Sequence, residues 1–127
     1  MEELAGNLIL DEKMLLLLYR KDEEHWEVPG GKVEENESPA QAAVREAEEE
    51  IGAEIELKKP FYTGEFQHDN QIFVWHAYVS EIQQRRPEVQ ESKFEELRWV
   101  EPGELDELDL APNLEMILPA LRKISRS

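Results

Sequence analysis

The chain has 127 residues and a formal net charge of −16, with 30 acidic and 14 basic side chains. This charge argues against sequence-independent binding to DNA, RNA or anionic membranes, which depends on positive surfaces. Cysteine is absent, which excludes disulfides and thiolate metal sites. The length predicts one domain over residues 1–127, and the apolar content of 40% is sufficient for a globular core.

The distribution of apolar and acidic residues predicts a cytoplasmic protein. No apolar run approaches the roughly 20 residues that cross a bilayer, and the acidic start MEELAGN lacks the pattern of a secretory signal. The acidic residues are spread along the chain, which predicts a solvated surface compatible with strong salt. We therefore hypothesise a halophilic source and expect no membrane or nucleic-acid partner.

The N-terminal part of the chain has the pattern of short strands. Residues 5–10 and 14–19 are apolar runs on either side of three polar residues, which predicts a β-hairpin. Residues 26–28 are typical of a short strand. We expect this strand to end in a turn over residues 29–31, because proline and glycine there break regular structure.

A helix is predicted over residues 39–51 because the signals at its two ends agree. Ser38 is a favourable N-cap, Pro39 suits the first helical position, and Gln41 completes a capping box. Gly52 provides a left-handed terminator. The face expected to pack on the core is a narrow stripe of small and apolar residues: Ala40, Ala43, Val44, Ala47 and Ile51.

The C-terminal half predicts further strands and a last helix. The predicted strands cover residues 54–57, 61–67, 71–79 and 96–100, with residues 68–70 as the connection between the middle two. The polar segment 83–92 is predicted to be a mobile loop. A helix is expected over residues 113–124, with cations at its end and one apolar stripe: Leu114, Ile117, Leu118, Leu121 and Ile124.

Three glutamates of the first predicted helix form the main candidate site. Glu46, Glu49 and Glu50 have i, i+3 and i+4 spacing and share one face. Such carboxylates repel one another by about 0.2–0.5 kcal/mol per pair on a solvated helix, and they crowd the end that disfavours anions. A bound Mg²⁺, or Mn²⁺, would make this arrangement favourable, because hard cations bind carboxylate oxygens. The alternative is a solvated acidic face, since glutamate supplies 25 of the 127 residues.

The spacing around these glutamates is G-x5-E-x7-R-E-x-x-E-E-x-G, formed by Gly31, Glu37, Arg45, Glu46, Glu49, Glu50 and Gly52. It resembles the Nudix box, the signature of enzymes that hydrolyse nucleoside diphosphates linked to another group. Ala47 and Ala53 occupy two positions where the family usually has bulky aliphatic residues. The resemblance implies an α+β fold of Nudix type: an α/β/α sandwich with a mixed β-sheet, the box helix and a C-terminal helix.

The resemblance also implies roles for the box residues. The implied metal ligands are Glu46, Glu49, Glu50 and the carbonyl of Gly30, with Glu46 as ligand or general base. Arg45 is a candidate catalytic residue, but we interpret it first as support, because its guanidinium could pair with Glu37 or Glu49 and fix the loop on the helix. Gly31, Glu37 and Gly52 form the structural part of the box.

Outside the box, an acidic residue near the start of the last strand is a further candidate. Glu95 resembles a metal-binding or base glutamate of MutT-type enzymes, while Glu91 and Glu96 compete for this role. The alternative for Glu95 is a solvated position on an edge strand. None of the three histidines has metal-ligand spacing, so all three are interpreted as incidental.

Three residues are candidates for substrate binding. Arg20 resembles a position near the nucleotide, and Lys32 could contact phosphate, although both could equally be surface charges. Asn113 resembles a base-reading asparagine, because an amide can both donate to and accept from a purine edge. It is also a plausible N-cap of the last helix.

The leading functional hypothesis is a MutT-type nucleoside triphosphate pyrophosphohydrolase that releases a monophosphate and pyrophosphate. Its Mg²⁺ would activate water and stabilise phosphoryl charge. One rival is a Nudix hydrolase of ADP-ribose, nucleotide sugars or dinucleoside polyphosphates. Another is a non-catalytic nucleotide-binding module. The expected partner is a small nucleotide, and the expected assembly is a monomer or homodimer.

Overall fold

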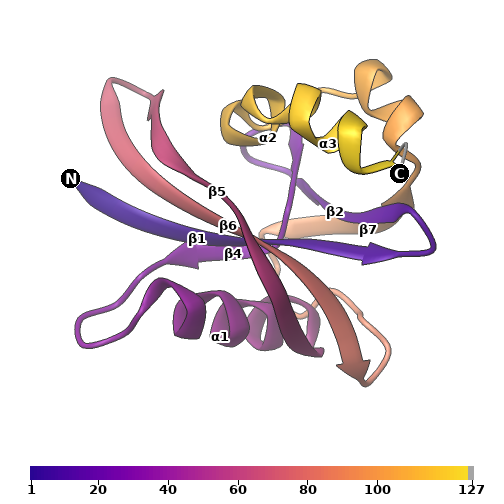
Figure 1. Cartoon of the computed structure of the whole chain (residues 1–127), viewed down its shortest axis with the longest axis horizontal. Coiled ribbons are helices and arrows are strands. Elements are labelled where there is room, and N and C mark those ends of the chain that lie inside the picture. Colours follow the sequence, from indigo (N-terminus) through magenta and orange to yellow (C-terminus); the bar gives the residue numbers. More distant parts are fainter. Residues whose placement is uncertain (126–127) are drawn as a thin grey trace.

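The structure of the protein is a computed structural model, which describes residues 1–125 (Figure 1). The strands are β1 (Glu2–Asp11), β2 (Met14–Arg20), β3 (His25–Glu27), β4 (Gly30–Lys32), β5 (Glu54–His68), β6 (Gln71–Gln84) and β7 (Phe94–Val100). The helices are α1 (Pro39–Ile51), the 3₁₀ helix η1 (Pro102–Glu107), α2 (Pro112–Met116) and α3 (Leu118–Ser125). None of these described helices has the length and apolar content needed to cross a lipid bilayer.

Strand β1 is the centre of a mixed sheet. It pairs in parallel with β6 and antiparallel with β4, and its last residues pair with β2. Strand β5 lies on the other side of β6, while β2 also pairs with β3 and β7. Helix α1 covers one face of the sheet, and α2 and α3 cover the other (Figure 1). The predicted α+β class, a mixed sheet between helices, is confirmed.

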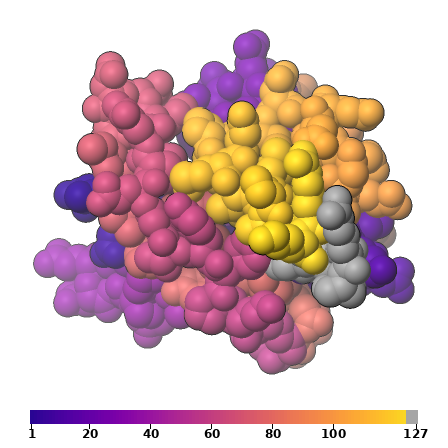
Figure 2. All heavy atoms as spheres, turned by 45° about the horizontal axis from the view of Figure 1, so that its top comes forward, coloured from indigo at the N-terminus to yellow at the C-terminus, as the bar shows by residue number. Residues whose placement is uncertain are grey.

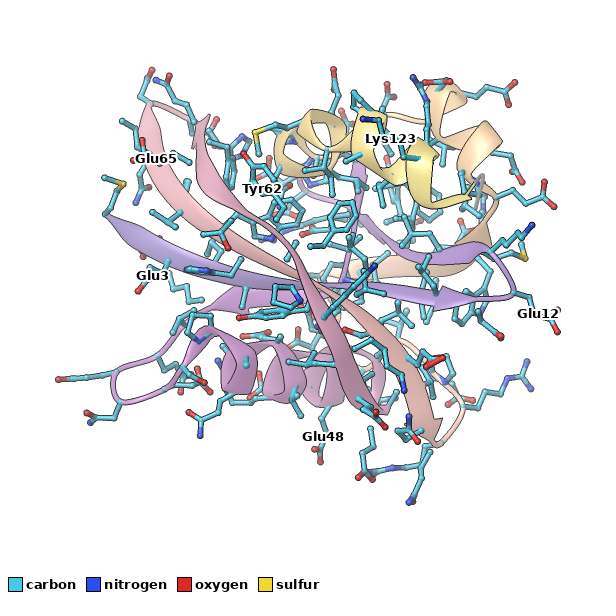
Figure 3. All side chains as sticks on the ribbon, viewed as in Figure 1. Glu3, Glu12, Glu48, Tyr62, Glu65 and Lys123 are labelled. Carbon is cyan, nitrogen blue, oxygen red and sulfur yellow. The ribbon has the colours of Figure 1, made fainter. Side chains whose placement is uncertain are left out.

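Both faces of the sheet are buried, which explains the unbroken apolar run in β2. Leu16 and Leu18 pack with the α1 side, whereas Leu15 and Leu17 pack with Trp26, Trp75 and the C-terminal helices. Strands covered on both faces need apolar residues at every position. Figure 2 shows the C-terminal helices and β5 as one continuous surface on the second face. The side chains of Glu12, Glu48 and Glu65, labelled in Figure 3, extend outward from the molecule.

Helix α1 begins and ends as its capping signals predict. The Ser38 hydroxyl accepts from the Gln41 N–H at 3.1 Å, and the Ser38 N–H donates to the Gln41 side chain at 2.9 Å. Gly52 has φ 65° and donates its N–H to the Glu48 carbonyl. The buried face differs slightly from the predicted stripe: it contains Ala42 and Glu50, while Ala40 is only half-buried.

The predicted hairpin is confirmed only at its tip. Leu10 pairs with Leu15 and Asp11 with Met14, after which β1 and β2 separate and find other partners. The predicted strands 54–57 and 61–67 form one strand, β5, with register shifts at Leu57/Lys59 and Pro60/Tyr62. Such bulges accommodate a proline that has no N–H to donate to the ladder.

Two other predicted elements are corrected. Gly30 and Gly31 do not form a turn, because they belong to β4 and pair with β1. The predicted helix 113–124 is interrupted at Ile117, which has φ −99° and ψ 7°. Pro119 explains this break, because it has no N–H to continue the hydrogen-bond ladder. Ile124 was also predicted to belong to the apolar stripe, but its side chain is outside the part of the chain that the structure describes.

The predicted loop between β6 and β7 is tied to the end of α1. The N–H of Glu88 donates to the carbonyl of Ile51, and the N–H of Gln90 donates to that of Glu50, both at 2.9 Å. These bonds carry the start of the β7 region toward the acidic face of the helix. The path of the loop therefore decides which acidic residue approaches the box.

Candidate active site

A cavity of about 480 Å³ opens between the sheet and the acidic face of α1. Its lining comes from β1, β2, β3, β4, α1, β6, the segment before β7 and α2. It includes six residues singled out from the sequence: Arg20, Gly30, Gly31, Lys32, Glu46 and Asn113. The fold thus gathers candidates that are up to 93 positions apart (Arg20 to Asn113, 113 − 20) into one wall.

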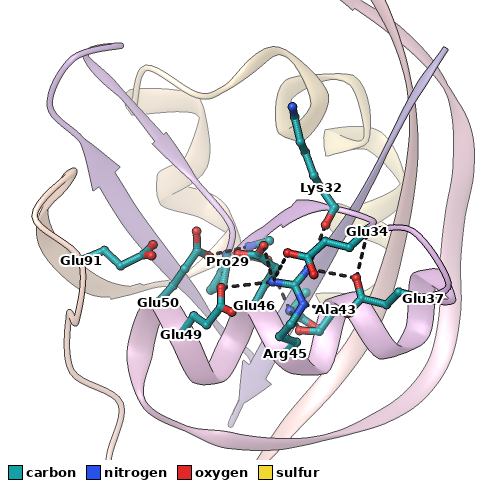
Figure 4. Close-up of polar contacts among 12 residues, drawn as sticks. Pro29, Lys32, Glu34, Glu37, Ala43, Arg45, Glu46, Glu49, Glu50 and Glu91 are labelled. Carbon is teal, nitrogen blue, oxygen red and sulfur yellow. Dashed lines mark hydrogen bonds and ion pairs between the residues drawn. The ribbon is translucent and has the colours of Figure 1, made fainter.

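Arg45 links the loop before α1, strand β4 and the acidic face of α1 (Figure 4). Its guanidinium donates to both carboxylate oxygens of Glu37, at 2.7 and 3.0 Å. It also donates to Glu46 at 3.0 Å, to Glu49 at 3.1 Å and to the carbonyl of Lys32 at 2.9 Å. Both pairings considered from the sequence are therefore present. These contacts agree with a supporting role for Arg45, which stays a prediction.

The same contacts shift the pKa values of this group. Hydrogen bonds from Arg45, together with the backbone N–H of Glu34, lower the pKa of Glu37 to about 2. The hydrogen bond to Glu37 is the main reason why the pKa of Arg45 is raised. Burial raises the pKa of Glu46, although Arg45 opposes this effect. A fixed guanidinium thus compensates the negative charge at this end of the helix.

Glu50 lies in a different environment, although it is on the same helix. Its side chain is 1% exposed, and one carboxylate oxygen accepts the N–H of Gly30 at 2.7 Å. The other oxygen, Oε2, is buried and has no hydrogen-bond partner. Burial raises the pKa of Glu50 to about 8, opposed by the Gly30 N–H and by Lys93. Buried unpaired carboxylate oxygens are rare and point to an expected ligand.

The two glycines at this wall are required by close contacts. A Cβ on Gly31 would lie within 2.5 Å of the Glu46 carboxyl group, and one on Gly30 would collide with the backbone of Ala5. Neither glycine has a positive φ. Their role is to let β4 lie close to β1 and to the helix carboxylates, and not to form the turn that the sequence suggested.

Two acids outside the box lie near Glu50. The charge of Glu27 helps to raise the pKa of Glu50, and Figure 4 shows the carboxylate of Glu91 turned toward Glu50. Lys93 connects Glu50 with Glu91. Oε1 of Glu91 is also buried without a hydrogen-bond partner. Lys93 Nζ lies 3.5 Å from this oxygen and 3.4 Å from Glu50 Oε2. Glu95, the first choice from the sequence, is exposed on β7, and neither Glu95 nor Glu91 is part of the cavity lining. The assignment of Glu95 as a metal-binding or base residue stays a prediction.

Sequence reasoning missed Lys93. Burial disfavours its ammonium form, yet Glu50 and Glu91 keep its pKa above the usual value. The available signal was a single cation in an acidic stretch, between Glu91 and Glu95. Glu27 was also missed: it lines the cavity, has a buried unpartnered oxygen and lies 3.6 Å from Arg20.

The predicted substrate residues all line the cavity, but their partners differ. Arg20 pairs with Asp22 at 3.1 Å, and Lys32 pairs with Glu2 at 2.7 Å. Asn113 is not the N-cap of a helix, because Ala111 has that position and Pro112 is the first residue of α2. The capping interpretation of Asn113 is therefore wrong.

The donor set at this wall fits a hard divalent cation. Carboxylates predominate among its polar groups, and these are the ligands that such a cation prefers. The two oxygens of Glu50 and Glu91 that lack a hydrogen bond both lie within 3.5 Å of Lys93 Nζ. The three box glutamates are not gathered around a single position, because Arg45 holds Glu46 and Glu49 while Glu50 turns to Gly30. Within residues 1–125, the only three ligating atoms within 4.8 Å of one another belong to Glu23, His68 and Asp69. This group includes a histidine that the sequence suggested was incidental.

A mixed sheet between helices, with a capped acidic helix beside a glycine-backed cavity, is the architecture of Nudix hydrolases. The sequence model of the NUDIX domain matches residues 4–121, and the chain belongs to this family. The predicted MutT-like resemblance is confirmed.

Two curated relatives are similar in sequence. A Bacillus subtilis protein named "Putative 8-oxo-dGTP diphosphatase" is 35% identical over 107 residues, which cover 84% of this chain and 70% of the relative. The CTP pyrophosphohydrolase of Escherichia coli is 33% identical over 87 residues, which cover 68% of this chain and 63% of the relative. The match therefore spans less than two thirds of the second enzyme.

Solved structures agree with this family. The solution structure of the Escherichia coli ORF135 protein has a TM-score of 0.80 at 30% identity, covering 98% of this chain and 90% of that chain. The crystal structure of a MutT protein from Methanosarcina mazei has a TM-score of 0.85 at 20% identity, covering 99% and 96%. At that identity the second likeness shows the fold alone.

Proposed function

We propose that this protein is a Mg²⁺-dependent nucleoside triphosphate pyrophosphohydrolase that releases a nucleoside monophosphate and pyrophosphate. The observation that carries the proposal is the pair of buried, unpartnered oxygens of Glu50 and Glu91 beside a cavity of about 480 Å³. Buried carboxylate oxygens are costly without a cation, and the Lys93 ammonium, at 3.4 and 3.5 Å, makes no well-formed hydrogen bond to these two. They supply oxygen ligands of the kind that Mg²⁺ or Mn²⁺ prefers.

The residues proposed to hold the metal are Glu50, Glu91 and the carbonyl of Gly30. Glu46 and Glu49 bond Arg45 in this structure, and we propose that they join the metal by turning away from it. A bound divalent ion supplies Lewis-acid stabilisation of phosphoryl charge and lowers the pKa of water. Glu46 borders the cavity, and burial raises its pKa, which suits a general base that accepts the proton of the attacking water. Glu91 takes the role that the sequence suggested for Glu95.

The cationic residues of the cavity help an acidic protein to bind an anion. The net charge of −16 repels a nucleotide polyphosphate, whereas Arg20, Lys32 and Lys93 line the cavity itself. Local cations of this kind attract the phosphate chain. Arg45 contributes indirectly by holding Glu46 and Glu49.

A second hollow of about 340 Å³ adjoins the first and suits the nucleobase. Asn113, Arg20 and Lys32 line both, and the second also contains Phe66 and Phe73. These rings are stacked with their centroids 5.3 Å apart, and aromatic faces can pack on a base. The two curated relatives carry the names "Putative 8-oxo-dGTP diphosphatase" and "CTP pyrophosphohydrolase", which supports a nucleoside triphosphate as the substrate class.

A nucleotide panel tests this proposal. The protein is incubated with Mg²⁺ and nucleoside triphosphates, ADP-ribose, nucleotide sugars or dinucleoside polyphosphates, and the products are identified by mass. Pyrophosphate with a monophosphate supports the proposal, whereas phosphate or sugar phosphate from the other substrates supports the rival hydrolases. Absence of turnover at low and high salt would favour a binding module.

A variant pair connects that activity to the box. Glu49→Gln is expected to lower turnover by about 100-fold or more and to leave the circular dichroism spectrum unchanged. Glu48→Gln is the matched control, because Glu48 is the adjacent, exposed glutamate on the same helix and lies outside the box. Retention of most activity by Glu49→Gln would count against the assignment.

A further inference from the structure

The corner of the site opposite Arg45 contains a cation of the protein itself. Glu50 Oε2 and Glu91 Oε1 are both buried and lack hydrogen-bond partners. Lys93 Nζ lies 3.4 Å from the first oxygen and 3.5 Å from the second. The two oxygens that most need a cation therefore share one ammonium group.

This ammonium is held loosely. Hydrogen bonds between charged nitrogen and oxygen atoms are typically about 2.7–2.9 Å long, so both contacts of Lys93 are longer than a well-formed pair. Its side chain is 38% exposed, whereas that of Glu50 is 1% exposed. Lysine has a compact charge on a flexible stem, which can move without disturbing the backbone.

Arg45 shows what a permanent partner looks like in the same site. It makes five hydrogen bonds of 2.7–3.1 Å, to Glu37, Glu46, Glu49 and the Lys32 carbonyl. Two of them bind Glu37 through both carboxylate oxygens, a geometry that fixes orientation. The site thus contains one cation held by five hydrogen bonds and a second, Lys93, held by two longer ion pairs and a contact with the Phe94 ring at 5.1 Å.

We propose that Lys93 is an exchangeable internal cation: it contacts Glu50 Oε2 and Glu91 Oε1 in the metal-free protein and is displaced from them when the divalent ion binds. This inference rests on the metal site of the proposed function and deepens it. Removal of a buried carboxylate's partner is strongly unfavourable, so a resident cation stabilises the empty site. The same contact competes with the metal, and it therefore lowers metal affinity. After displacement, the ammonium remains at the cavity wall, where it can bind phosphate.

Metal binding without nucleotide tests this competition. Lys93→Met removes the charge and keeps the length of the side chain. Mn²⁺ binding is followed by electron paramagnetic resonance of the free ion at constant ionic strength. We expect Lys93→Met to bind Mn²⁺ about tenfold more tightly than the wild type, within the range of ordinary site coupling. In EDTA the same variant should unfold at a lower temperature, because the buried Glu50 and the buried Oε1 of Glu91 lose the contact with the ammonium.

Lys58→Met is the matched control. It makes the same change in net charge, but Lys58 pairs with Glu56 and Glu81 on the strands and does not line the cavity. Its Mn²⁺ affinity should equal that of the wild type, which separates local competition from a general increase in negative charge. Equal or weaker Mn²⁺ binding by Lys93→Met would show that Lys93 supports the metal-bound state, and would overturn the inference.

A measurement on the wild type covers the case in which Lys93→Met does not fold. Amine-reactive labelling with mass spectrometry gives the modification rate of each lysine, with and without Mg²⁺. The rate at Lys93 should rise several-fold on addition of Mg²⁺, while the rate at Lys58 stays constant. An unchanged or slower rate at Lys93 would contradict displacement.

These outcomes distinguish the two proposals. Neither measurement needs turnover, so failure to find a hydrolysed nucleotide leaves the result on Lys93 intact. If the wild type binds Mn²⁺ but Lys93→Met does not bind it more tightly, only the inference fails. If the wild type has no Mn²⁺ site that Glu50→Gln weakens, both the inference and the metal part of the proposed function fail.

Discussion

The acidic residues at the two ends of the acidic face of α1 differ in how their negative charges are compensated. At the Arg45 end, Glu37, Glu46 and Glu49 accept hydrogen bonds of 2.7–3.1 Å from one guanidinium. At the Lys93 end, Glu50 and Glu91 each keep a buried oxygen without a hydrogen bond. The carboxylates at the Arg45 end are thus satisfied within the protein, whereas incomplete satisfaction at the Lys93 end marks a place where a ligand is expected.

The Lys93 end should be sensitive to a neutral substitution of its buried carboxylate. Glu50→Gln removes the carboxylate that the ligand needs, and turnover should fall by about 10²–10⁴-fold, the range for loss of an essential catalytic group. Glu48→Gln is the control outside both ends and should remain near the wild-type rate, since Glu48 is exposed. Steady-state kinetics with Mg²⁺ measure both. Similar rates for both variants would show that the buried Glu50 carboxylate matters no more for turnover than an exposed glutamate.

A smaller loss of activity is expected when a methyl group is added to Gly31, beside the acidic face of α1. Gly31→Ala puts a Cβ within 2.5 Å of the Glu46 carboxyl group. Because the end of a side chain can move, we expect a loss of activity of about 10–100-fold with little loss of stability. Gly103→Ala is the control, because a Cβ there has no neighbour within 4 Å. An unchanged rate for Gly31→Ala would mean that the position of Glu46 is unimportant.

A substitution at the Arg45 end should instead lower mainly the thermal stability of the protein. Arg45→Lys loses the two-point contact with Glu37 and most of the other hydrogen bonds, and the melting temperature should fall by about 3–8 °C. Arg98→Lys provides a comparison, because Arg98 pairs with the exposed Glu96 and its guanidinium lies 4.6 Å from the centroid of the Trp26 ring, without a two-point contact to a second element. Equal melting temperatures for the two variants would show that the Arg45 contacts contribute no more than those of Arg98.

The two ends should also have opposite pH dependence in the metal-free protein. The folded pKa of Glu37 is lowered from 4.5 to about 2, so its contribution is present above pH 4.5 and is lost as the pH falls toward 2. The folded pKa of Glu50 is raised from 4.5 to about 8, so its contribution is present below pH 4.5 and is lost as the pH rises through 8.

Denaturant unfolding in EDTA tests these slopes. Glu37→Gln should flatten the acid limb between about pH 2 and 4.5, and Glu50→Gln should flatten the decline between about pH 4.5 and 8. Each variant serves as the control for the other window. A Glu50→Gln profile that parallels the wild type across the upper window would show that Glu50 does not cause the decline.

The amino-acid sequence by itself determined the local elements. The bounds of α1 follow from Ser38, Pro39, Gln41 and Gly52, whose effects reach only a few residues along the chain. The spacing of the box residues carried the resemblance to the Nudix family, and that resemblance implied the α+β class. Where the predictions failed, a distant contact or a proline prevailed: β4 pairs with β1, and Pro119 divides the last helix.

Only the tertiary structure decided which residues complete the site. Glu91, and not Glu95, reaches Glu50, because backbone hydrogen bonds from Glu88 and Gln90 tie the loop to the end of α1. The meeting of Glu50, Glu91 and Lys93 joins two segments about 40 residues apart (Glu50 to Glu91, 91 − 50 = 41). Local spacing contains no information about such a contact, since it depends on how separate elements pack on the sheet and on the burial that results.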